Sequence, residues 1–531
     1  MPTSNDDGWT AAIDQPVIAH VGPAPDGESS GCENGIGATN TPTTSSTSDT
    51  LVAGLSVMLV LTVVQRVFGF LRNVLFCRLM SPADLGIWNL AETTLILTAP
   101  LLVVGVPGCL NRYVEHYRVR GQLKAFIKRV FLVSGSLVVV GAALMLAFQS
   151  RLVLIAFGDS SYGKTFTMIV GVVVIVVAYN LLDEMLVAMR RVRLVSFVRF
   201  GNSLAFNVLA IGMLVGTNLR ANAVVIAYGL AYLLTLTCAA VYLKPVWGEI
   251  ATSNKFLSHA KLWPRILPFA GFLWMTDFLE NSFEAVDRYM ILHFSGLSDT
   301  HALELVGQYH CSRIIGVLLA SVANMFANIL VPYLSEDWER DRSLVSRKMN
   351  FTIKLVAVAI VSVSVAIVLA SPIIFNSLLD NRYSEGFQVL PCTMLYCVWF
   401  GITMLCHSYL FCAEKSWLPT IGIVAGLVTN LALNTLWLPV YGLSGAVWAT
   451  TVANLVSLVL CLTFCWKHGM RVTLGLVTVV FLFPLILLLP PLASVIASFV
   501  FLAAATFPGL VFSSEELSQI VETIRSKMRL A

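Results

Sequence analysis

Residues 62–88 hold the first side chains that could do chemistry, because an apolar stretch there carries amide and guanidinium groups at regular intervals. Gln65 and Arg72 are seven residues apart, and so are Arg66 and Asn73. A spacing of seven returns a helical side chain to the same face, so two neighbouring polar faces are predicted along one otherwise apolar helix. The pattern predicts a cationic wall that faces a polar cavity.

A second set of polar side chains shares one face of a later helix, at intervals of three and four residues: Asp277, Glu280, Asn281, Glu284, Asp287 and Arg288. An ionised side chain at the centre of a bilayer costs roughly 2.5 to 3.5 kcal/mol, so such residues face a wet cavity, pair or bind a proton. We predict that Glu280 and Glu284 face a cavity. For Asp287 and Arg288, an ion pair with each other at the outer membrane interface is an equal alternative.

Single charged residues in other apolar stretches extend the set of candidates. Glu92 and Arg313 are candidate cavity residues because each lies inside a predicted span. The neighbours Asp183 and Glu184 are candidates too, although they also fit a helix end. Arg78 is expected to reach the outer head groups by snorkelling.

The composition defines the elements that must position these residues. Hydrophobic residues make up 57% of the 531 residues and charged residues 12%, and the mean hydropathy is +0.81. So few charges cannot cover a soluble protein of this size, and the apolar stretches are long and continuous, so we predict an all-α polytopic membrane protein. The net charge of +4 is too small to indicate nucleic-acid binding.

About fourteen transmembrane helices are predicted. They lie near residues 52–76, 86–107, 127–149, 166–188, 197–217, 222–243, 265–286, 313–334, 351–375, 388–411, 417–438, 443–465, 472–489 and 491–507. Alternate loops hold most of the Lys and Arg residues, which places those loops and both termini in the cytoplasm of a cell whose inner (plasma) membrane the chain crosses.

The ends of the chain differ from the spans in composition. Residues 1–50 contain seven acidic residues and no Lys or Arg, so they are predicted to be a disordered cytoplasmic tail ahead of an uncleaved first span. Residues 508–531 contain a capping box from Ser513 to Glu516 and an amphipathic helix. This helix is expected to lie on the inner membrane surface, with partner binding as the alternative.

Weak internal similarity indicates a duplicated architecture. A shift of 223 residues superposes Asn207 on Asn430, and a shift of 221 superposes Gly86 on Gly307. Together with the six-span spacing, these matches predict two six-helix lobes, 51–245 and 246–466, around a central cavity, followed by two further helices in 467–507. Two repeats with an even number of spans share one orientation, so the binding site is expected between them.

Two local patterns carry no chemistry in this interpretation. The eleven cysteines fall mostly inside apolar stretches and are expected to be small buried hydrophobic residues, with no metal site. Residues 158–165, GDSSYGKT, match the phosphate-loop pattern. A phosphate loop needs a preceding strand, whereas this segment joins two predicted spans, so the match is interpreted as a coincidence.

Several segments resemble the Wzx-type oligosaccharide flippases of the multidrug/oligosaccharidyl-lipid/polysaccharide (MOP) superfamily. They are QRVFGFLRN (65–73) followed by PADLGIWNLAETTL, then GCLNRYVEHYRVRGQ (108–122), ENSFEAVDRYMILHFSG with VGQYHCSRI, and CAEKSWLPTIGIVAGLVTNLALNTLWLPVYGLSGAVWATTVANLVS (412–457). The resemblance implies a two-lobed transporter that moves a polyprenyl-pyrophosphate-linked oligosaccharide across the membrane for export of cell-surface polysaccharide.

By the shared first-helix pattern Arg72 carries over as a cavity residue, and for the other candidates we predict roles in such a transporter. The cavity that would bind the pyrophosphate includes Gln65, Arg66, Arg72, Asn73, Glu92 and Arg313. The residues that would bind a coupling Na⁺ or H⁺, with no other cofactor, are Asp277, Glu280, Glu284 and Asp287. Lipid II flippases share the R-V-x-G-F-x-R pattern followed by Asp, and Asn73 replaces that Asp here. This difference argues against lipid II itself as the substrate.

Two other functions stay open at this point. A multidrug or cation exporter of the same superfamily would depend on the carboxylates and not on the arginines. A membrane glycan polymerase or ligase needs an outer catalytic domain, and the outer loops are too short for one, so no enzyme is predicted. The expected partners are the lipid-linked glycan, membrane lipids and polysaccharide assembly proteins, with no nucleic acid, and the protein is expected to be a monomer.

Overall fold

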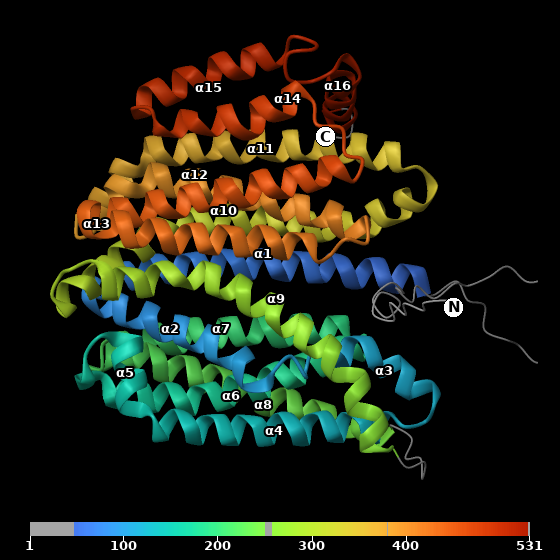
Figure 1. Cartoon of the computed structure of the whole chain (residues 1–531), viewed down its shortest axis with the longest axis vertical. Helices are drawn as coiled ribbons and strands as arrows, with labels where there is room; N and C mark the ends of the chain where they lie inside the picture. The colour runs from blue at the N-terminus through green and yellow to red at the C-terminus, as the bar shows by residue number, and fades with distance from the viewer. Residues whose placement is uncertain (1–46, 250–256, 380, 529–531) are drawn as a thin grey trace, which may run out of the picture. The chain divides into compact units, whose positions relative to one another are not determined.

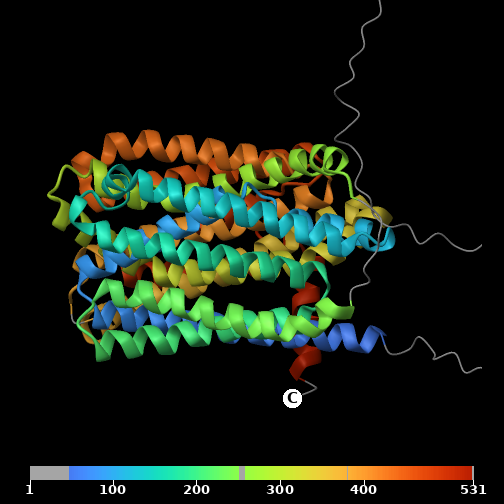
Figure 2. The ribbon, with the colours of Figure 1, turned by 90° about the horizontal axis from the view of Figure 1, so that it is seen from below.

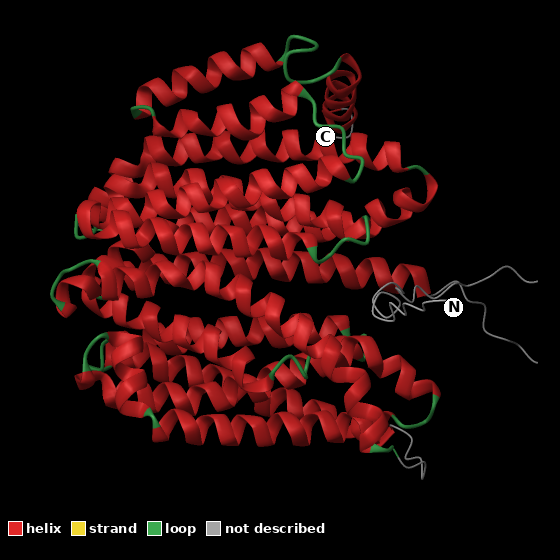
Figure 3. Cartoon of the chain, in the orientation of Figure 1, coloured by secondary structure: helices red, strands yellow, loops and turns green. Residues whose placement is uncertain are grey.

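The computed structural model describes residues 47–249, 257–379 and 381–528, and every regular element in these ranges is helical (Figure 3). The α-helices are α1 (Thr47–Leu79), α2 (Pro82–Val103), α3 (Cys109–Val119), α4 (Leu123–Ala147), α5 (Gln149–Phe157), α6 (Gly163–Ala188), α7 (Val192–Gly216), α8 (Ala221–Glu249), α9 (His259–Phe294), α10 (Asp299–Arg340), α11 (Arg342–Ile373), α12 (Ser384–Cys412), α13 (Leu418–Lys467), α14 (Leu474–Val477), α15 (Pro491–Ala505) and α16 (Ser514–Met528). The predicted tail at 1–50 lies almost wholly outside the described residues.

The helices confirm an all-α polytopic membrane protein. In the described ranges, ten helices are long and apolar enough to cross a bilayer, and two shorter apolar helices cover Leu474–Leu488 and Pro491–Ala505. The 50-residue α13 contains two spans, because Gly442 breaks it with φ 57° and ψ −137°. The charged face of α9 keeps that helix out of the set of ten, although its 36 residues are long enough to cross.

The short connection between α1 and α2 follows from local sequence. Ser81 caps α2 by accepting a hydrogen bond from the backbone N–H of Asp84, and Pro82 occupies the first turn. Proline lacks the N–H that the first turn leaves unpaired, so it fits there without loss of a hydrogen bond. The chain therefore turns back at once, and α2 carries Glu92 into the interior.

Within residues 52–531, the long helices run alongside one another (Figures 1 and 2) and α2 packs against helices of both halves of the chain. On one side it contacts α6 and α8, which pack with α7. On the other it contacts α10, which packs with α12, and α12 in turn contacts α13. The last two spans pack against α11 and α12. The contact of α2 with α10 thus links the two halves directly, as does its contact with α9.

Two glycines bring α2 and α10 into backbone contact. A Cβ atom on Gly86 would lie 1.9 Å from the carbonyl oxygen of Leu303, and one on Gly307 would lie 2.0 Å from that of Pro82. Small residues allow such close approach between membrane helices. Gly86 and Gly307 are 221 residues apart, so positions that the sequence shift superposes face each other across this contact.

Asn89 and His310 extend the same relation one turn further along the two helices. The Asn89 amide nitrogen lies 2.7 Å from the His310 ring Nδ1, and these residues are also 221 apart. A pair of equivalent residues that contact each other is the arrangement expected around a two-fold axis. The α2–α10 contact therefore has the local geometry of such an axis.

The helix α9 contacts both halves of the chain. Near its start, the Tyr113 hydroxyl of α3 donates to the carbonyl oxygen of Arg265, and His116 contacts the Arg265 guanidinium at 3.1 Å. Partial burial and the positive charges of Arg265 and Arg120 lower the pKa of His116. The neutral ring therefore accepts hydrogen bonds from these guanidinium groups. The second half of α9 packs against α13. Pro264 and Pro268 lie in the first half, where α9 meets α3.

The C-terminal helix α16 begins with the predicted capping box. The Ser513 hydroxyl accepts from the Glu516 N–H at 3.2 Å, and the Glu516 carboxylate accepts from the Ser513 N–H at 2.7 Å. Glu516 also pairs with Lys354 of α11 at 3.1 Å, and both side chains are largely buried. The first turn of α16 is therefore held against α11. Of the predicted apolar face, Leu517 is half-buried and Val521 exposed, while the side chains of Ile520, Ile524 and Met528 lie outside the description.

The two patterns without predicted chemistry behave as expected in the described residues. Ten cysteines there are free thiols, and all but Cys238 are buried. In the segment that matches a phosphate loop, the helix α5 stands where such a loop requires a strand, and Asp159 accepts from the Ser161 N–H. The hydrogen bonds from Ser161 lower the pKa of Asp159.

Candidate functional site

Three chambers with shared walls lie between the helices of residues 52–531. We name them the cationic chamber, of about 500 Å³, the acidic chamber, of about 630 Å³, and the C-terminal chamber, of about 380 Å³. Tyr228 and Tyr232 line both of the first two, Glu280 lines the last two, and Arg66 lines the first and the last. The chambers therefore adjoin one another.

The cationic chamber contains all five cavity residues predicted in the first two spans: Gln65, Arg66, Arg72, Asn73 and Glu92. The helix α1 supplies four of them, and α2 supplies Glu92. The α7 residue Arg199 adds a third guanidinium group, so three cations and one carboxylate line this space. In a site partly shielded from water, such an excess of positive charge attracts anions.

Aromatic rings hold Arg72 in place in this chamber. Its guanidinium group lies 4.4 Å from the ring centre of Phe206 and donates to the side-chain oxygen of Asn207 at 3.2 Å. Its Nε atom has no partner within the described residues. Arg66, one and a half turns earlier, is exposed to the cavity. The protein thus positions Arg72, and both guanidinium groups line the chamber, where they can donate to a ligand.

The acidic chamber has a different lining, contributed by α2, α3, α6, α8 and α9. Its titratable residues are four carboxylic acids and two tyrosines: Asp183, Glu184, Asp277, Glu280, Tyr228 and Tyr232. Asp183 forms a bidentate ion pair with Arg199 of the neighbouring chamber, with a closest distance of 2.6 Å. Glu184 accepts from the Asn111 amide at 2.5 Å. No Lys, Arg or His residue is among the described residues that line this chamber.

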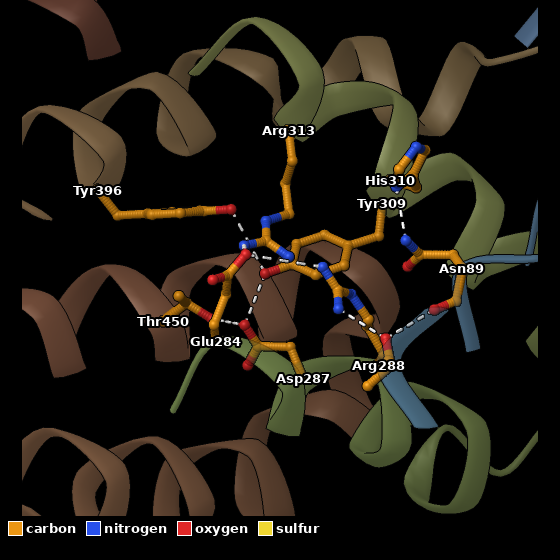
Figure 4. A network of polar contacts seen from close by, with 10 residues as sticks. Asn89, Glu284, Asp287, Arg288, Tyr309, His310, Arg313, Tyr396 and Thr450 are labelled. Atoms are coloured by element: carbon orange, nitrogen blue, oxygen red, sulfur yellow. Dashed lines mark hydrogen bonds and ion pairs between the residues drawn. The ribbon is translucent and has the colours of Figure 1, made fainter. Parts of the chain in front are cut away.

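Asp287 is the best-satisfied carboxylate of the C-terminal chamber (Figure 4). One oxygen accepts from the amides of Asn430 and Asn434, at 2.9 and 3.0 Å. The other accepts from the hydroxyls of Tyr309 and Thr450, at 2.6 and 2.7 Å. These donors come from α10 and from both spans of α13. They compensate the cost of burying Asp287, whose exposed fraction is 1%.

Glu284 lies between two arginines in the same region (Figure 4). Its carboxylate is 3.5 Å from the guanidinium of Arg313 and 4.0 Å from that of Arg288. Arg288 also donates to the Thr93 hydroxyl of α2 at 2.6 Å. Arg313 lies over the Tyr309 ring at 5.2 Å. Both guanidinium groups are nearly buried, so a single carboxylate partly neutralises two buried cations.

The structure overturns one predicted alternative and refines others. Asp287 and Arg288 are both buried, with exposed fractions of 1% and 7%, and they contact different helices instead of each other. The acidic residues of α9 do not form one site either. Asp277 lines the acidic chamber, Asp287 the C-terminal chamber, and Glu280 both. The two chambers lie one after the other along α9, so side chains on successive turns of this helix line different chambers.

The remaining candidates are Arg313, the Asp183 and Glu184 pair, and Arg78, and each lies in a different part of the molecule. Arg313 lines the C-terminal chamber instead of the cationic one. Asp183 and Glu184 are paired wall residues, as described above. Arg78 is exposed near the end of α1, and its carbonyl oxygen accepts from Arg382 at 2.8 Å.

Several contributors were not predicted as site residues from the sequence. Arg199, which falls at the start of the predicted span 197–217, reaches the cavity from the first third of α7. Asn430 and Asn434 are one turn apart, which is a visible signal of a shared polar face. Tyr228 and Tyr232 have the same spacing, and their hydroxyls are 3.1 Å apart. In each case only the packing of distant helices shows what the face contacts.

A model of the polysaccharide biosynthesis protein family matches residues 51–338, more than half of the chain. The chain therefore belongs to this family. A search of curated proteins finds no significant match.

Solved structures with a similar fold include a lipid II flippase and multidrug resistance transporters. A lipid II flippase, MurJ, in an inward closed conformation, is 15% identical with a TM-score of 0.62, over 84% of this chain and 98% of that chain. An inward-facing multidrug resistance MATE transporter is 13% identical with a TM-score of 0.59, over 77% of this chain and 96% of that one. At these identities the likeness establishes the fold. The family match and these folds bear out the resemblance found in the sequence, and the apolar helices mark a multi-pass membrane protein.

Proposed function

We propose that the protein is a flippase that moves a polyprenyl-diphosphate-linked oligosaccharide from the cytoplasmic to the outer leaflet. The observation that carries this proposal is the cationic chamber, in which Arg66, Arg72 and Arg199 line about 500 Å³ of the membrane interior. A diphosphate presents closely spaced oxygens that match the planar donors of guanidinium groups. The family match to polysaccharide biosynthesis proteins supports a glycan as the attached group.

Transport requires the helices that enclose the cavity to move apart alternately at the two ends. The Gly86 and Gly307 contacts hold α2 against α10 at the end predicted to face outward. Release of the substrate to that side would require these contacts to separate. Packed helices with two discrete arrangements are the usual basis for such a transition.

Coupling to a cation gradient would involve Asp287, which is the most deeply buried of the predicted coupling residues. A proton or Na⁺ at its carboxylate would change the hydrogen bonds that join α9, α10 and α13. Two helices of one half would thereby respond to the ion, which gives the gradient a way to bias the arrangement of the cavity. We place the coupling ion at Asp287 in preference to Asp277. Asp277 is exposed, and among the described residues its side chain forms no hydrogen bond or ion pair with another helix.

A multidrug or cation exporter remains the second candidate, and the acidic chamber is the observation that favours it. Four carboxylic acids line that chamber, and a hydrophobic cation would be attracted to it. This function would depend on Asp277 and Glu280 and would not need Arg66 or Arg72.

Transport in reconstituted vesicles distinguishes the two candidates. The full-length protein is placed in liposomes with a fluorescent polyprenyl-diphosphate-N-acetylglucosamine, and the lipid in each leaflet is measured with a membrane-impermeant quencher. We expect rapid exchange for the wild type and a loss of about 10- to 100-fold in Arg66→Ala and Arg72→Ala, the effect of losing charge-assisted hydrogen bonds. Arg78→Ala is the matched control, because Arg78 is exposed and does not line the chambers. Wild-type rates in both cavity variants would overturn the proposal.

The coupling ion is identified in the same reconstituted vesicles. We propose that the protein resides in the plasma membrane with both termini in the cytoplasm and acts as a monomer. Imposed Na⁺ and pH gradients then identify the coupling ion, and Asp287→Asn is expected to abolish the response to whichever gradient is effective. Elongation or transfer of glycan by purified protein in detergent, where no leaflets exist, would instead indicate an enzyme.

A further inference from the structure

The acidic chamber contains polar side chains that the protein itself leaves without partners. Among the described residues, the carboxylates of Asp277 and Glu280 and the side-chain amide of Asn180 take part in no hydrogen bond or ion pair. The indole N–H of Trp274 is buried and also lacks a partner. Unpartnered polar groups inside a membrane protein cost free energy unless something polar occupies the space beside them.

The other two carboxylates of the chamber are already used. Asp183 is paired with Arg199, and Glu184 accepts from Asn111. They complete the wall, whereas the unpartnered groups on α6 and α9 are available to a ligand.

We propose that the acidic chamber binds the sugar portion of the lipid-linked substrate and selects neutral or amino sugars over uronic acids. This inference rests on the proposed flippase function and names the substrate class of the same cavity. Sugar hydroxyl groups both donate and accept, so they can satisfy carboxylates, an amide and an indole N–H at once. The volume of about 630 Å³ lies in the range of small-molecule sites.

Selection against uronic acids follows from the sign of the charges. A carboxylate on the sugar would enter a space whose described lining has four carboxylic acids and no basic residue. Like charges at close range inside a protein repel strongly, so the chamber discriminates by repulsion as well as by contact. A protonated amino sugar would instead be attracted to Asp277 and Glu280.

The position of the chamber fits a single ligand that spans two spaces. Tyr228 and Tyr232 line both the cationic and the acidic chamber, so they form a wall that the two chambers share. A diphosphate held by the arginines on one side would place the attached sugar on the other side of this pair. Phenol groups offer a hydroxyl and an apolar ring, which suits the boundary between a phosphate and a sugar.

Binding of four probe lipids to the full-length protein in nanodiscs tests the proposal. The probes are polyprenyl diphosphate alone and the same lipid carrying N-acetylglucosamine, glucosamine or glucuronic acid. We expect the first two sugar lipids to bind about tenfold more tightly than the glucuronic acid lipid, and more tightly than the bare lipid. In the double variant Asp277→Asn, Glu280→Gln, the affinity for the glucuronic acid lipid should rise until the preference is lost. Glu304→Gln is the matched control for removing a charge, because Glu304 is exposed and its one ion pair within the described residues is with His301.

The outcomes separate this inference from the proposed function. If the bare diphosphate lipid binds and Arg72→Ala weakens it, the flippase proposal is supported. With that result in hand, equal affinity for the neutral and glucuronic acid lipids, or an unchanged preference in the double variant, would overturn the sugar assignment alone. If none of the four lipids binds, or Arg72→Ala leaves the binding unchanged, the proposed function fails and the inference fails with it.

Discussion

The helices α1 and α9 carry the two polar faces of this chain, and the protein supports them in opposite ways. Arg72 lies seven residues before the end of α1 at Leu79, and Asp287 lies seven residues before the end of α9 at Phe294. Arg72 donates to Asn207, and Asp287 accepts from Asn430. These asparagines are the pair superposed by the 223-residue shift. Equivalent positions of the two halves therefore carry opposite charges.

The support around the two residues differs as much as their charge. Two helices other than α9, namely α10 and both spans of α13, supply the four donors of Asp287, so its carboxylate is fully satisfied. Arg72 has one hydrogen bond and one close aromatic ring, and most side chains of α1 from residue 60 onward are exposed or half-buried. We infer that Asp287 mainly ties helices together, whereas Arg72 is kept available for a ligand.

The largest expected effect comes from removing Asp287. Asp287→Ala leaves four donors from α10 and α13 without their acceptor. At about 0.6 kcal/mol for each hydrogen bond between membrane helices, the loss is roughly 2 to 3 kcal/mol of stability. Thermal unfolding in detergent should show a lower melting temperature. Asp277→Ala is the control, and equal melting temperatures for the two variants would contradict the structural role of Asp287.

Removing Arg72 should affect substrate binding more than stability. Arg72→Ala is expected to weaken binding of a polyprenyl diphosphate by about 10- to 100-fold, from the loss of charge-assisted hydrogen bonds worth roughly 1.5 to 3 kcal/mol. Its melting temperature should change less than that of Asp287→Ala. A variant that melts early but binds normally would reverse the roles assigned to the two helices.

The contact between equivalent glycines gives an effect of intermediate size. Gly86→Ala places a Cβ atom 1.9 Å from the Leu303 carbonyl oxygen, which is backbone and cannot turn away. Overpacking of this kind costs about 1 to 3 kcal/mol, so α2 and α10 should separate. Spin labels at the half-buried Asp84 and the exposed Glu304 report the separation by electron–electron distance measurement. Gly135→Ala, where a Cβ meets nothing within 4 Å, is the control. An unchanged distance distribution would show that the contact does not hold the two helices together.

The smallest effect is expected at Glu284, whose side chain is 55% exposed. Glu284→Gln removes the carboxylate between Arg288 and Arg313 and leaves their positive charge uncompensated. The partly exposed pairs are worth under about 1 kcal/mol, so stability should fall only slightly. Binding of a bare polyprenyl diphosphate should tighten by about twofold, because the cavity gains positive charge. Weaker binding would indicate that Glu284 positions the arginines instead of neutralising them.

Much of this arrangement follows from the sequence, and the reasons for the exceptions are physical. Apolar length predicts the spans, and helical spacing predicts the polar face of α1, because both depend on local periodicity. Neither can show that Asp287 meets Asn430, which is 143 residues away. Nor can they show that Arg199 pairs with Asp183, which lies on another helix.

The division of the α9 face between two chambers could not be predicted for a related reason. A helical wheel gives the direction of a side chain but not what lies beside each turn. Glu280 and Asp287 are two turns apart, and the neighbouring helices change over that distance. Charge spacing therefore identified the residues of α9 that matter without showing that they serve different spaces.

A structure of the full-length protein with a bound polyprenyl-diphosphate-N-acetylglucosamine tests the central claim most directly. The account predicts density for the diphosphate beside Arg66 and Arg72, with the four donors of Asp287 retained or replaced by a coupling ion. Density for the diphosphate outside the cationic chamber, with both guanidinium groups free, would contradict it.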